Sequence, residues 1–334
     1  MGPVRLGIVG CGAVAEMAHI PAAQQVEDVR LVALIDTDLA RANSLAAHHG
    51  IPLVAAGVED LAEEVDAVIL ATPPHVRCHI ARQALERGLH VLCEKPMANT
   101  SDECRQMVEM ARSAQRTLAV GHTYRFFPNR IRSRALIQGG ELGSLISGKI
   151  EQGDPFSWPS HTFYTLKKDW VPGGVLFNEG IHLLDMLLWW FGTPSSFEYR
   201  DDSLGGLESN VHLSLSYADG SAVSFRLSRT SRLANRVELQ FRQGAISFPV
   251  YDMGTLGLAM NGKLETLVLQ EPTWDFVRAA AAQLRNFSLS ILQGRPPAVT
   301  GEEGLAVVAF IEACYARSAE RSRPARTPSP GLIW

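Results

Sequence analysis

A charged tripeptide, Glu94-Lys95-Pro96, interrupts an apolar run at residues 90–93 that has the character of a buried strand. Charged side chains are rarely wholly buried, and where they are, they are paired or in use. An ammonium group held at the tip of such a strand could donate a hydrogen bond to a substrate oxygen. Pro96 would restrict the backbone so that Lys95 leaves the strand in one direction. The tripeptide therefore indicates a functional site at this end of a sheet.

A phosphate-binding loop is indicated near the N-terminus by the GxGxxA pattern Gly10-Cys11-Gly12-Ala13-Val14-Ala15. The pattern lies directly after a strand-like run and before a predicted helix. The first glycine permits a tight turn, the second lets the backbone approach a pyrophosphate, and the small alanine allows helix and strand to pack closely. Unpaired N–H groups at the helix N-terminus would then face the phosphates.

An acid follows the second predicted strand, where Asp36 would accept hydrogen bonds from the ribose hydroxyls and repel a 2′-phosphate. This position favours NAD over NADP. Arg41 is near enough in sequence to soften that preference, so that NADP stays an alternative cofactor.

The first 122 residues alternate between apolar runs and helix-like segments, which is typical of a parallel sheet covered by helices. We predict strands at residues 5–10, 29–36, 53–55, 65–72, 90–96 and 117–126, with helices at 13–25, 39–50, 75–88 and 101–115. Ligands of such sheets bind beyond the carboxyl ends of the strands. Besides the residues of the GxGxxA loop, the residues expected to contact the dinucleotide are Asp36, Thr37, Arg41, Ala71, Thr72, Pro73, His75, His79, Glu94, Lys95 and His122.

The second half of the chain has a different pattern, with closely spaced runs in which polar and apolar residues alternate. Such alternation is typical of an antiparallel sheet that packs one face on a core. Strands are predicted at 145–153, 209–217, 221–228, 236–242, 245–250 and 263–270, with a hairpin turn at Asp219-Gly220 and helices at 274–293 and 302–320. The predicted domains are residues 1–122 and 123–322, the final helix of which could pack back on the first domain, followed by a tail at 323–334.

Composition narrows the class of protein. The chain has 334 residues, is 46% hydrophobic, and carries a formal net charge of -4, so nothing points to nucleic acid or to an anionic membrane surface. The apolar stretch at 183–192 is too short to cross a membrane. Five scattered cysteines support no disulfide framework, which makes a cytoplasmic location the default. The i, i+4 pair His75 and His79 could hold zinc, but a third ligand is missing nearby, and no metal site is predicted.

The order of these motifs resembles the Gfo/Idh/MocA family, named after glucose–fructose oxidoreductase, inositol dehydrogenase and rhizopine catabolism. The resemblance rests on GxGxxA, Thr72-Pro73-Pro74 with His79, EKPMA at 94–98 and GGVLFNEGIHLLD at 173–185. It implies an α/β fold, with an N-terminal doubly wound Rossmann sheet and a C-terminal α/β domain with a large, open, mostly antiparallel sheet. It also implies a nicotinamide cofactor and homodimers or homotetramers associated through that sheet.

The resemblance places the catalytic lysine at Lys95 and the catalytic histidine at His182. The acid position of the second motif holds Asn178 here, and Asp185 follows His182 by three residues. Residues three and four apart share a helix face, so all three are expected to reach one pocket. An amide can orient a hydroxyl or an imidazole but cannot carry a proton. His182 as a packed core histidine and Asp185 as a structural partner are the alternatives.

Further substrate contacts are expected from two segments. Tyr124 and Arg125 follow the last strand of the first domain and could line the substrate entrance, although Arg125 could equally be a salt-bridge partner. The proline- and aromatic-rich loop at 153–170 borders the active site in the family, so Lys168 or Trp158 could recognise a sugar or a phosphate. A loop packed for its own sake is the alternative.

The predicted function is hydride transfer between NAD(P) and a secondary alcohol or ketone of a sugar, nucleotide sugar or cyclitol. One alternative is an NAD-dependent glycosidase that oxidises, eliminates and re-reduces its sugar. A non-catalytic nicotinamide-binding protein is the other, and the presence of both Lys95 and His182 argues against it.

Overall fold

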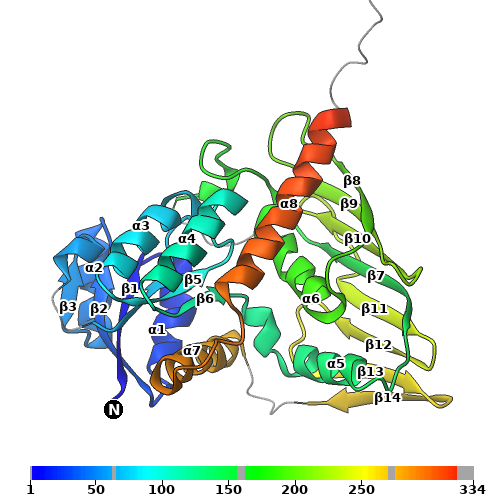
Figure 1. Cartoon of the computed structure of the whole chain (residues 1–334), viewed down its shortest axis with the longest axis horizontal. Helices are drawn as coiled ribbons and strands as arrows, with labels where there is room; N and C mark the ends of the chain where they lie inside the picture. Colours follow the sequence, from blue (N-terminus) through cyan, green and yellow to red (C-terminus); the bar gives the residue numbers. More distant parts are fainter. Residues whose placement is uncertain (1, 62–64, 156–161, 270–274, 322–334) are drawn as a thin grey trace, which may run out of the picture.

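The computed structural model describes residues 2–61, 65–155, 162–269 and 275–321, and their strands form two sheets (Figure 1). The first sheet has the order β3-β2-β1-β4-β5-β6, and its neighbouring strands are all parallel. Its strands are β1 (Val4–Val9), β2 (Val29–Ile35), β3 (Leu53–Ala55), β4 (Ala67–Leu70), β5 (His90–Glu94) and β6 (Leu118–Gly121). The order reverses between β1 and β4, which confirms the predicted doubly wound sheet.

Helices cover both faces of this sheet because its buried strands present apolar side chains on both sides. In β5, Val91 and Cys93 belong to one apolar cluster, whereas Leu92 between them belongs to another. The first cluster includes residues of α3 (Pro74–Glu86), α4 (Ser101–Ser113) and α8 (Gly301–Arg321). The second includes residues of η1 (Ala15–His19), α1 (Ile20–Ala23), α2 (Leu39–His49) and α7 (Phe276–Gln293).

Local signals fix the helix ends. Asp38 caps α2 by accepting a hydrogen bond from the backbone N–H of Arg41, and Gly50 ends the helix at φ +67°. Thr100 and Glu103 form a reciprocal capping box at the start of α4. These helices begin and end within two residues of the positions that the sequence predicts.

The helix expected at 13–25 is confirmed: Ala13 and Val14 are helical, and η1 and α1 continue the helix to Ala23. The prediction for the last strand of this half is wrong in detail. The strand expected at 117–126 ends at Gly121, and residues Thr123–Phe126 form the 3₁₀ turn η3. This turn carries Arg125 into a buried ion pair, which an extended strand at this place would not reach.

The second sheet has the order β14-β13-β12-β11-β7-β10-β9-β8. Only the pairing of β10 with β7 is parallel among its described strand pairs, so the sheet is mostly antiparallel, as predicted. The strands are β7 (Leu145–Gly153), β8 (Ser196–Asp201), β9 (Asn210–Ser216), β10 (Ala222–Ser228), β11 (Arg236–Phe241), β12 (Gly244–Pro249), β13 (Thr255–Met260) and β14 (Lys263–Val268).

Three elements of this half are additional to those that the sequence predicts: β8, β13 and the helix α5 (Pro128–Gln138). β8 buries Tyr199 alone, and α5 has a largely polar sequence, so neither carries a clear apolar period. The hairpin at Asp219-Gly220 does join antiparallel strands β9 and β10, with Gly220 at φ +86°.

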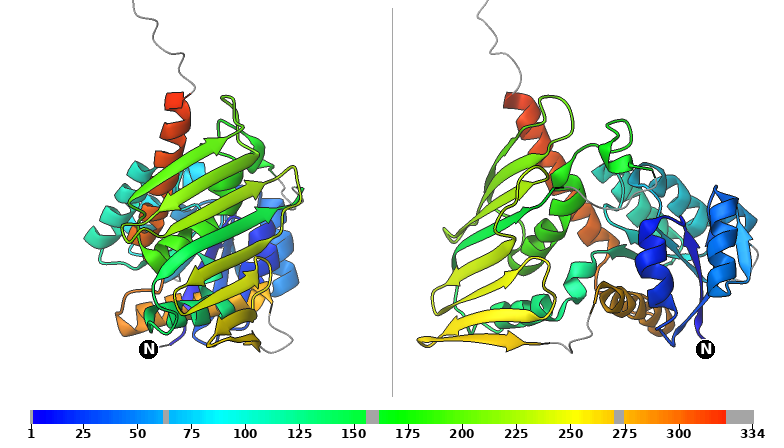
Figure 2. Two further views of the ribbon diagram at one scale, coloured as in Figure 1. Left: turned by 90° about the vertical axis from the view of Figure 1, so that its right-hand side faces the viewer. Right: turned by 180° about the vertical axis from the view of Figure 1, so that it is seen from behind.

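One face of the second sheet is covered and the other is open. Helices α5, α8 and α6 (Ile181–Phe191) lie on the inner face, and the outer face turns away from the rest of the molecule (Figures 1 and 2). The alternating burial of β11, in which Val237, Leu239 and Phe241 are buried between exposed residues, follows from this arrangement. Among the described residues, no helix is long and apolar enough to cross a membrane.

The helix α8 joins the two halves of the molecule (Figure 1). It contacts α4 and β6 of the first half and α6 and β8 of the second. Close approach to β6 requires glycine, because a Cβ at Gly301 would lie 2.8 Å from Leu118 Cδ2 and one at Gly304 would lie 2.6 Å from Val120 Cγ2. The tail at 323–334 lies outside the described residues.

A buried ion pair holds the same junction. Arg125 of η3 is 4% exposed and forms two parallel hydrogen bonds to the carboxylate of Asp185, which is 0% exposed, at 2.8 Å and 2.6 Å. Its third nitrogen bonds Glu303 of α8. Such a fork geometry satisfies a buried carboxylate, and breaking it leaves a charge without compensation.

We predict that Arg125→Ala lowers the free energy of unfolding by about 3 to 5 kcal/mol, because Asp185 would keep a desolvated charge. Urea denaturation followed by fluorescence measures the change. The control is Arg105→Ala, which removes an exposed i, i+3 pair with Asp102 and should cost less than about 0.5 kcal/mol. Equal small effects of the two substitutions would show that water reaches Asp185.

Candidate active site

A cavity of about 1530 Å³ lies where the two halves of the molecule face each other. Its lining begins at the carboxyl ends of β1, β2, β4 and β5 and continues to η5 (Leu176–Gly180), α6 and the end of β10. This volume exceeds that of an ordinary small-molecule pocket, for which about 300 to 1,000 Å³ is usual. There is room for a dinucleotide together with a small substrate.

The GxGxxA loop has the backbone geometry of a phosphate cradle. Gly10 has φ +98°, and a Cβ there would lie 2.9 Å from the backbone of Ala71 and Thr72, so only glycine fits. A Cβ at Gly12 would instead meet no protein atom within 4 Å, and this glycine lines the cavity. The bare backbone at Gly12 therefore leaves space for the pyrophosphate of a dinucleotide, and the loop fits that group.

The end of β2 supplies the acid expected beside a ribose. Asp36 lines the cavity, and its two carboxylate oxygens accept hydrogen bonds from the backbone N–H groups of Cys11 at 2.6 Å and Asp38 at 2.8 Å. Each oxygen keeps a further lone pair for a ribose hydroxyl. Arg41 Nη2 lies 3.2 Å from Asp38 Oδ2, so the guanidinium that could bind a 2′-phosphate is engaged by another carboxylate.

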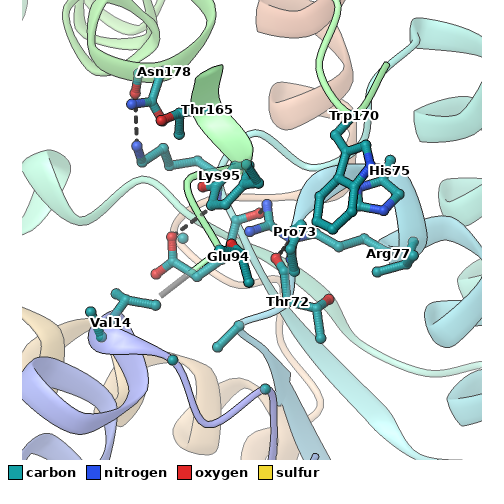
Figure 3. A pocket seen from close by; sticks show the side chains of 18 of the residues that line it. Val14, Thr72, Pro73, His75, Arg77, Glu94, Lys95, Thr165, Trp170 and Asn178 are labelled. Atoms are coloured by element: carbon teal, nitrogen blue, oxygen red, sulfur yellow. Dashed lines mark hydrogen bonds between the residues drawn. The ribbon is translucent and has the colours of Figure 1, made fainter. Parts of the chain in front are cut away.

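Several hydrogen bonds fix the charged tripeptide Glu94-Lys95-Pro96 at the end of β5 (Figure 3). Glu94 Oε1 lies 3.0 Å from His19 Nε2, and Glu94 Oε2 accepts from the backbone N–H of Lys95 at 3.0 Å. Arg77 donates to the carbonyls of Thr72, Glu94 and Pro96, and the Lys95–Pro96 peptide bond is cis. Burial alone would raise the pKa of Glu94, but its bond to His19 and the nearby cations lower the pKa overall.

Lys95 crosses from the first sheet to the second half of the molecule. Its ammonium Nζ donates to the backbone carbonyl of Asn178 at 2.8 Å (Figure 3). This bond uses one of the three ammonium protons, so the group can still donate to a substrate oxygen. Burial lowers the pKa of Lys95, and the charges of Glu94 and Glu179 oppose that shift.

His182 lies on the same cavity and is neutral. Its ring stacks on Tyr124 with centroids 4.2 Å apart and an interplanar angle of 13°. Burial, together with the charges of Lys95 and His122, holds the pKa of His182 well below its usual value. Its Nδ1 has no hydrogen-bond partner within the described part of the chain. A neutral imidazole that lines a cavity can accept a proton from a bound group.

Most residues predicted to contact cofactor or substrate line this cavity. They are Gly10, Gly12, Ala13, Val14, Asp36, Thr37, Arg41, Ala71, Thr72, Pro73, His75, His79, Glu94, Lys95, Tyr124, Asn178 and His182. The described parts of the loop at 153–170 also contribute, through Asp154, Pro155, Thr162, Tyr164, Thr165 and Trp170. Trp158 lies outside the described residues.

Three residues predicted to contact the dinucleotide lie behind the cavity wall. Cys11 and Ala15 are fully buried beneath the loop, where their side chains pack against β1 and its neighbours. His122 is buried too, with Nδ1 3.8 Å from Asp185 Oδ2. These three residues are absent from the cavity lining, and they lie beneath residues that form it.

Three residues predicted to contact substrate lie elsewhere as well. Arg125 and Asp185 are committed to each other and are absent from the cavity lining. One helical turn separates His182 from Asp185, but η3 lies against the aspartate and keeps it from the cavity. Lys168 is exposed, bonds the carbonyl of Gly205 and lines a separate hollow of about 430 Å³.

Several lining residues carry no motif in the sequence. Trp170 lies against His75 with ring centroids 4.6 Å apart, and its carbonyl accepts from Asn99 Nδ2 at 3.0 Å (Figure 3). Glu179 and Arg229 form an ion pair at 2.9 Å on the opposite side. In the sequence, the one signal for Glu179 is that it directly follows Asn178 of the second motif. The described residues hold no group of three or more His, Cys, Asp or Glu side chains arranged for a metal.

Comparison with known protein families finds two domain models that match this chain. Residues 4–122 match the family model described as "Oxidoreductase family, NAD-binding Rossmann fold", and residues 131–247 match the GFO/IDH/MocA C-terminal domain. The chain belongs to the Gfo/Idh/MocA oxidoreductase family. Members are oxidoreductases that act on CH–OH groups, and the matched N-terminal domain is an NAD-binding Rossmann fold.

Named relatives of this Gfo/Idh/MocA protein match over nearly their full length. D-glucoside 3-dehydrogenase of Escherichia coli (strain K12) is 27% identical over 95% of this chain and 96% of the relative. The rhizopine catabolism protein MocA of Rhizobium meliloti is 28% identical over 92% and 93%. The structure of aldose-aldose oxidoreductase from Caulobacter crescentus, complexed with glycerol, matches with a TM-score of 0.85 and 25% identity, over 96% of this chain and 98% of that one.

We predict that Asp36→Asn raises the ratio of kcat/KM with NADP to kcat/KM with NAD by at least about tenfold, because the amide no longer repels a 2′-phosphate. Initial rates with each cofactor at saturating substrate, or cofactor binding by calorimetry, measure the ratio. Glu27→Gln is the matched control, since Glu27 is an exposed acid near the opposite end of β2. A ratio unchanged in Asp36→Asn would remove this aspartate from cofactor selection.

Proposed function

We propose that this protein transfers a hydride between NAD and a secondary alcohol or ketone of a sugar, nucleotide sugar or cyclitol. One observation carries the proposal: Lys95 and His182, which are 87 positions apart by their numbers, line the same cavity beside the phosphate loop. The relatives named for D-glucoside and rhizopine substrates support the same class of polyhydroxylated molecule.

The chemistry divides between these two side chains. His182, which burial and nearby cations keep neutral, accepts the proton of the substrate hydroxyl. Lys95 donates a hydrogen bond to the oxygen as negative charge develops on it, which stabilises the transition state more than the ground state. Bound NAD supplies the hydride acceptor. For ketone reduction the same groups act in reverse, and His182 returns the proton.

Neighbouring residues orient this pair. The carbonyl of Asn178 aims the Lys95 ammonium, and the Tyr124 ring fixes the plane of the imidazole. The amide side chain of Asn178 donates to Glu179 at 3.1 Å, so it orients a carboxylate and carries no proton itself. Positioning of this kind accounts for a large part of catalytic rate enhancement in general.

The proposed assembly is a homodimer or homotetramer formed through the outer face of the second sheet. That face carries exposed apolar side chains near its edge, including Leu264 and Val268 of β14. A second copy covering the face would bury them. The proposed domain boundary between residues 122 and 123 places this face entirely in the second domain.

An NAD-dependent glycosidase would use the same site but release sugar with no net change in NADH. Absorbance at the NADH band with a panel of sugars and polyols separates the two activities, because net oxidation accumulates NADH. Accumulation with at least one alcohol supports the dehydrogenase, whereas release of an aglycone without NADH would support the glycosidase.

We predict that Lys95→Met lowers kcat by at least about a hundredfold while the Kd for NADH changes little, because the lost donor acts on the transition state. Stopped-flow absorbance gives kcat, and fluorescence titration gives the Kd. Lys263→Met, which removes an exposed lysine on β14, is the control and should leave both unchanged. Turnover that survives in Lys95→Met would reject the assigned role of Lys95.

We predict that the acidic limb of kcat/KM for alcohol oxidation lies below pH 6.5. Burial lowers the pKa of His182, so the imidazole stays neutral, and active as a base, as the pH falls through 6.5. Burial also lowers the pKa of Lys95, so the alkaline limb should lie below pH 10.5. A pH–rate profile tests both limbs, and His182→Asn should lose the acidic one. An acidic limb above pH 6.5 would contradict a desolvated His182.

A further inference from the structure

An ion pair lies at the end of the cavity that the second half of the molecule forms, here called the substrate end. Its acid, Glu179, follows by one residue the position where the family motif has its acid. Glu179 Oε2 lies 2.9 Å from Arg229 Nε, and Glu179 Oε1 accepts from Asn178 Nδ2 at 3.1 Å. Arg229 is 8% exposed and its Nη2 donates to the Gly174 carbonyl at 3.2 Å. Both members line the cavity. The carboxylate is therefore held in place at its two oxygens and keeps lone pairs for a ligand.

The charge of Glu179 acts on the whole substrate end. Burial raises the pKa of Tyr124 to about 12; the charge of Arg130 opposes this shift, and those of Tyr251 and Glu179 add to it. The pKa values of Tyr164 and Tyr251 are also raised, by burial first and by Glu179 among their neighbours. These phenols line the cavity with Lys95, whose cationic form Glu179 also favours. Glu179 itself lines the same cavity as these four residues.

The arginine side chains that line the cavity already bind carboxylates or backbone carbonyls of the protein. At the rim, Arg232 Nε lies 3.2 Å from Asp154 Oδ1, in a second arginine–carboxylate pair. Arg77 donates to three backbone carbonyls, and Arg41 is engaged by Asp38 at the adenosine end. Among the described lining residues, the Lys95 ammonium is the cation left for substrate, and the reacting oxygen uses it. A carboxylate or phosphate on the reacting ring would therefore meet the negative charge of Glu179 in place of an available cation.

Two buried polar atoms complete this end of the cavity. Thr165 Oγ1 and Gln152 Oε1 have no hydrogen-bond partner in residues 2–61, 65–155, 162–269 and 275–321. Their side chains belong to residues that are 4% and 7% exposed and line the cavity. Thr165 and Gln152 therefore give this end of the cavity a lining that is polar and uncharged.

We propose that Glu179, held by Arg229, determines specificity by selecting a reacting ring that carries hydroxyl groups and no carboxylate or phosphate. Hydroxyl groups donate charge-assisted hydrogen bonds to its carboxylate. An anionic ring is disfavoured because like charges would meet in a site shielded from water. This inference rests on the proposed function and narrows its substrate class to rings that are neutral at the reacting unit.

Matched pairs of neutral sugar and sugar acid test the selection. Saturation-transfer NMR titrations of the NADH-loaded enzyme with D-glucose and D-glucuronate, and with D-galactose and D-galacturonate, give the ratio of affinities within each pair at fixed ionic strength. Wild-type enzyme should prefer the neutral member. Glu179→Gln should move the ratio towards the acid by at least about tenfold, because the negative charge that repels an anionic ring is removed. Glu179→Asp keeps the charge and should keep the preference.

Two further variants make the test specific. Glu238→Gln removes one member of an exposed arginine–glutamate pair with Arg236 on β11 and should leave the ratio as in wild type. Arg229→Gln leaves the Glu179 charge without its cation, so the ratio should move further towards the neutral sugar and D-glucosamine should gain affinity. The Kd for NADH and the Tm of each variant check that it is folded.

The binding ratios are read without turnover, so they are separate from the test of the proposed function. Failure of every sugar and polyol to produce NADH would reject the dehydrogenase but leave the ratios measurable. The inference is overturned if Glu179→Gln leaves the ratio unchanged, if Glu238→Gln shifts it equally, or if neither member of either pair binds the wild-type enzyme.

Discussion

The ammonium group of Lys95 is desolvated between two sheets that fold from different parts of the chain. Its bond to the Asn178 carbonyl spans that junction, and the charges that face it, Glu94 and Glu179, come from opposite sides. An unpaired buried cation would be costly. The site therefore exists only when both halves are in place, and Lys95, the proposed catalytic lysine, itself links them.

Other buried charged side chains near this junction are also held by partners from different elements. His19 of η1 holds Glu94, Arg77 of α3 secures the backbone around it, and Arg125 ties η3 to α6 and α8. Buried ion pairs contribute less to net stability than their geometry suggests, but removing one partner is expensive. Their arrangement here restricts the positions of Lys95 and His182, and restricted geometry is what hydride and proton transfer require.

The second motif shows how a small change in sequence alters a site. With asparagine at position 178, the carboxylate at this end of the cavity belongs to Glu179 and is balanced by Arg229. His182 lacks an acid at its Nδ1 among the described residues, and its neutral form follows from burial and from the nearby cations. In the function proposed above, proton transfer and substrate recognition belong to different side chains.

The sequence by itself determined the two sheets, the phosphate loop, Asp36 and the strand-end position of Lys95. These depend on periods of two and of about 3.6 residues and on the rule that ligands lie beyond the carboxyl ends of parallel strands. Only the tertiary structure decided that Asp185 and Arg125 pair behind the wall, that Lys168 lies at another hollow, and that Glu179 with Arg229 lines the cavity. Spacing along a helix fixes which residues share a face, but the element packed against each turn decides whether a side chain meets the cavity or a buried partner.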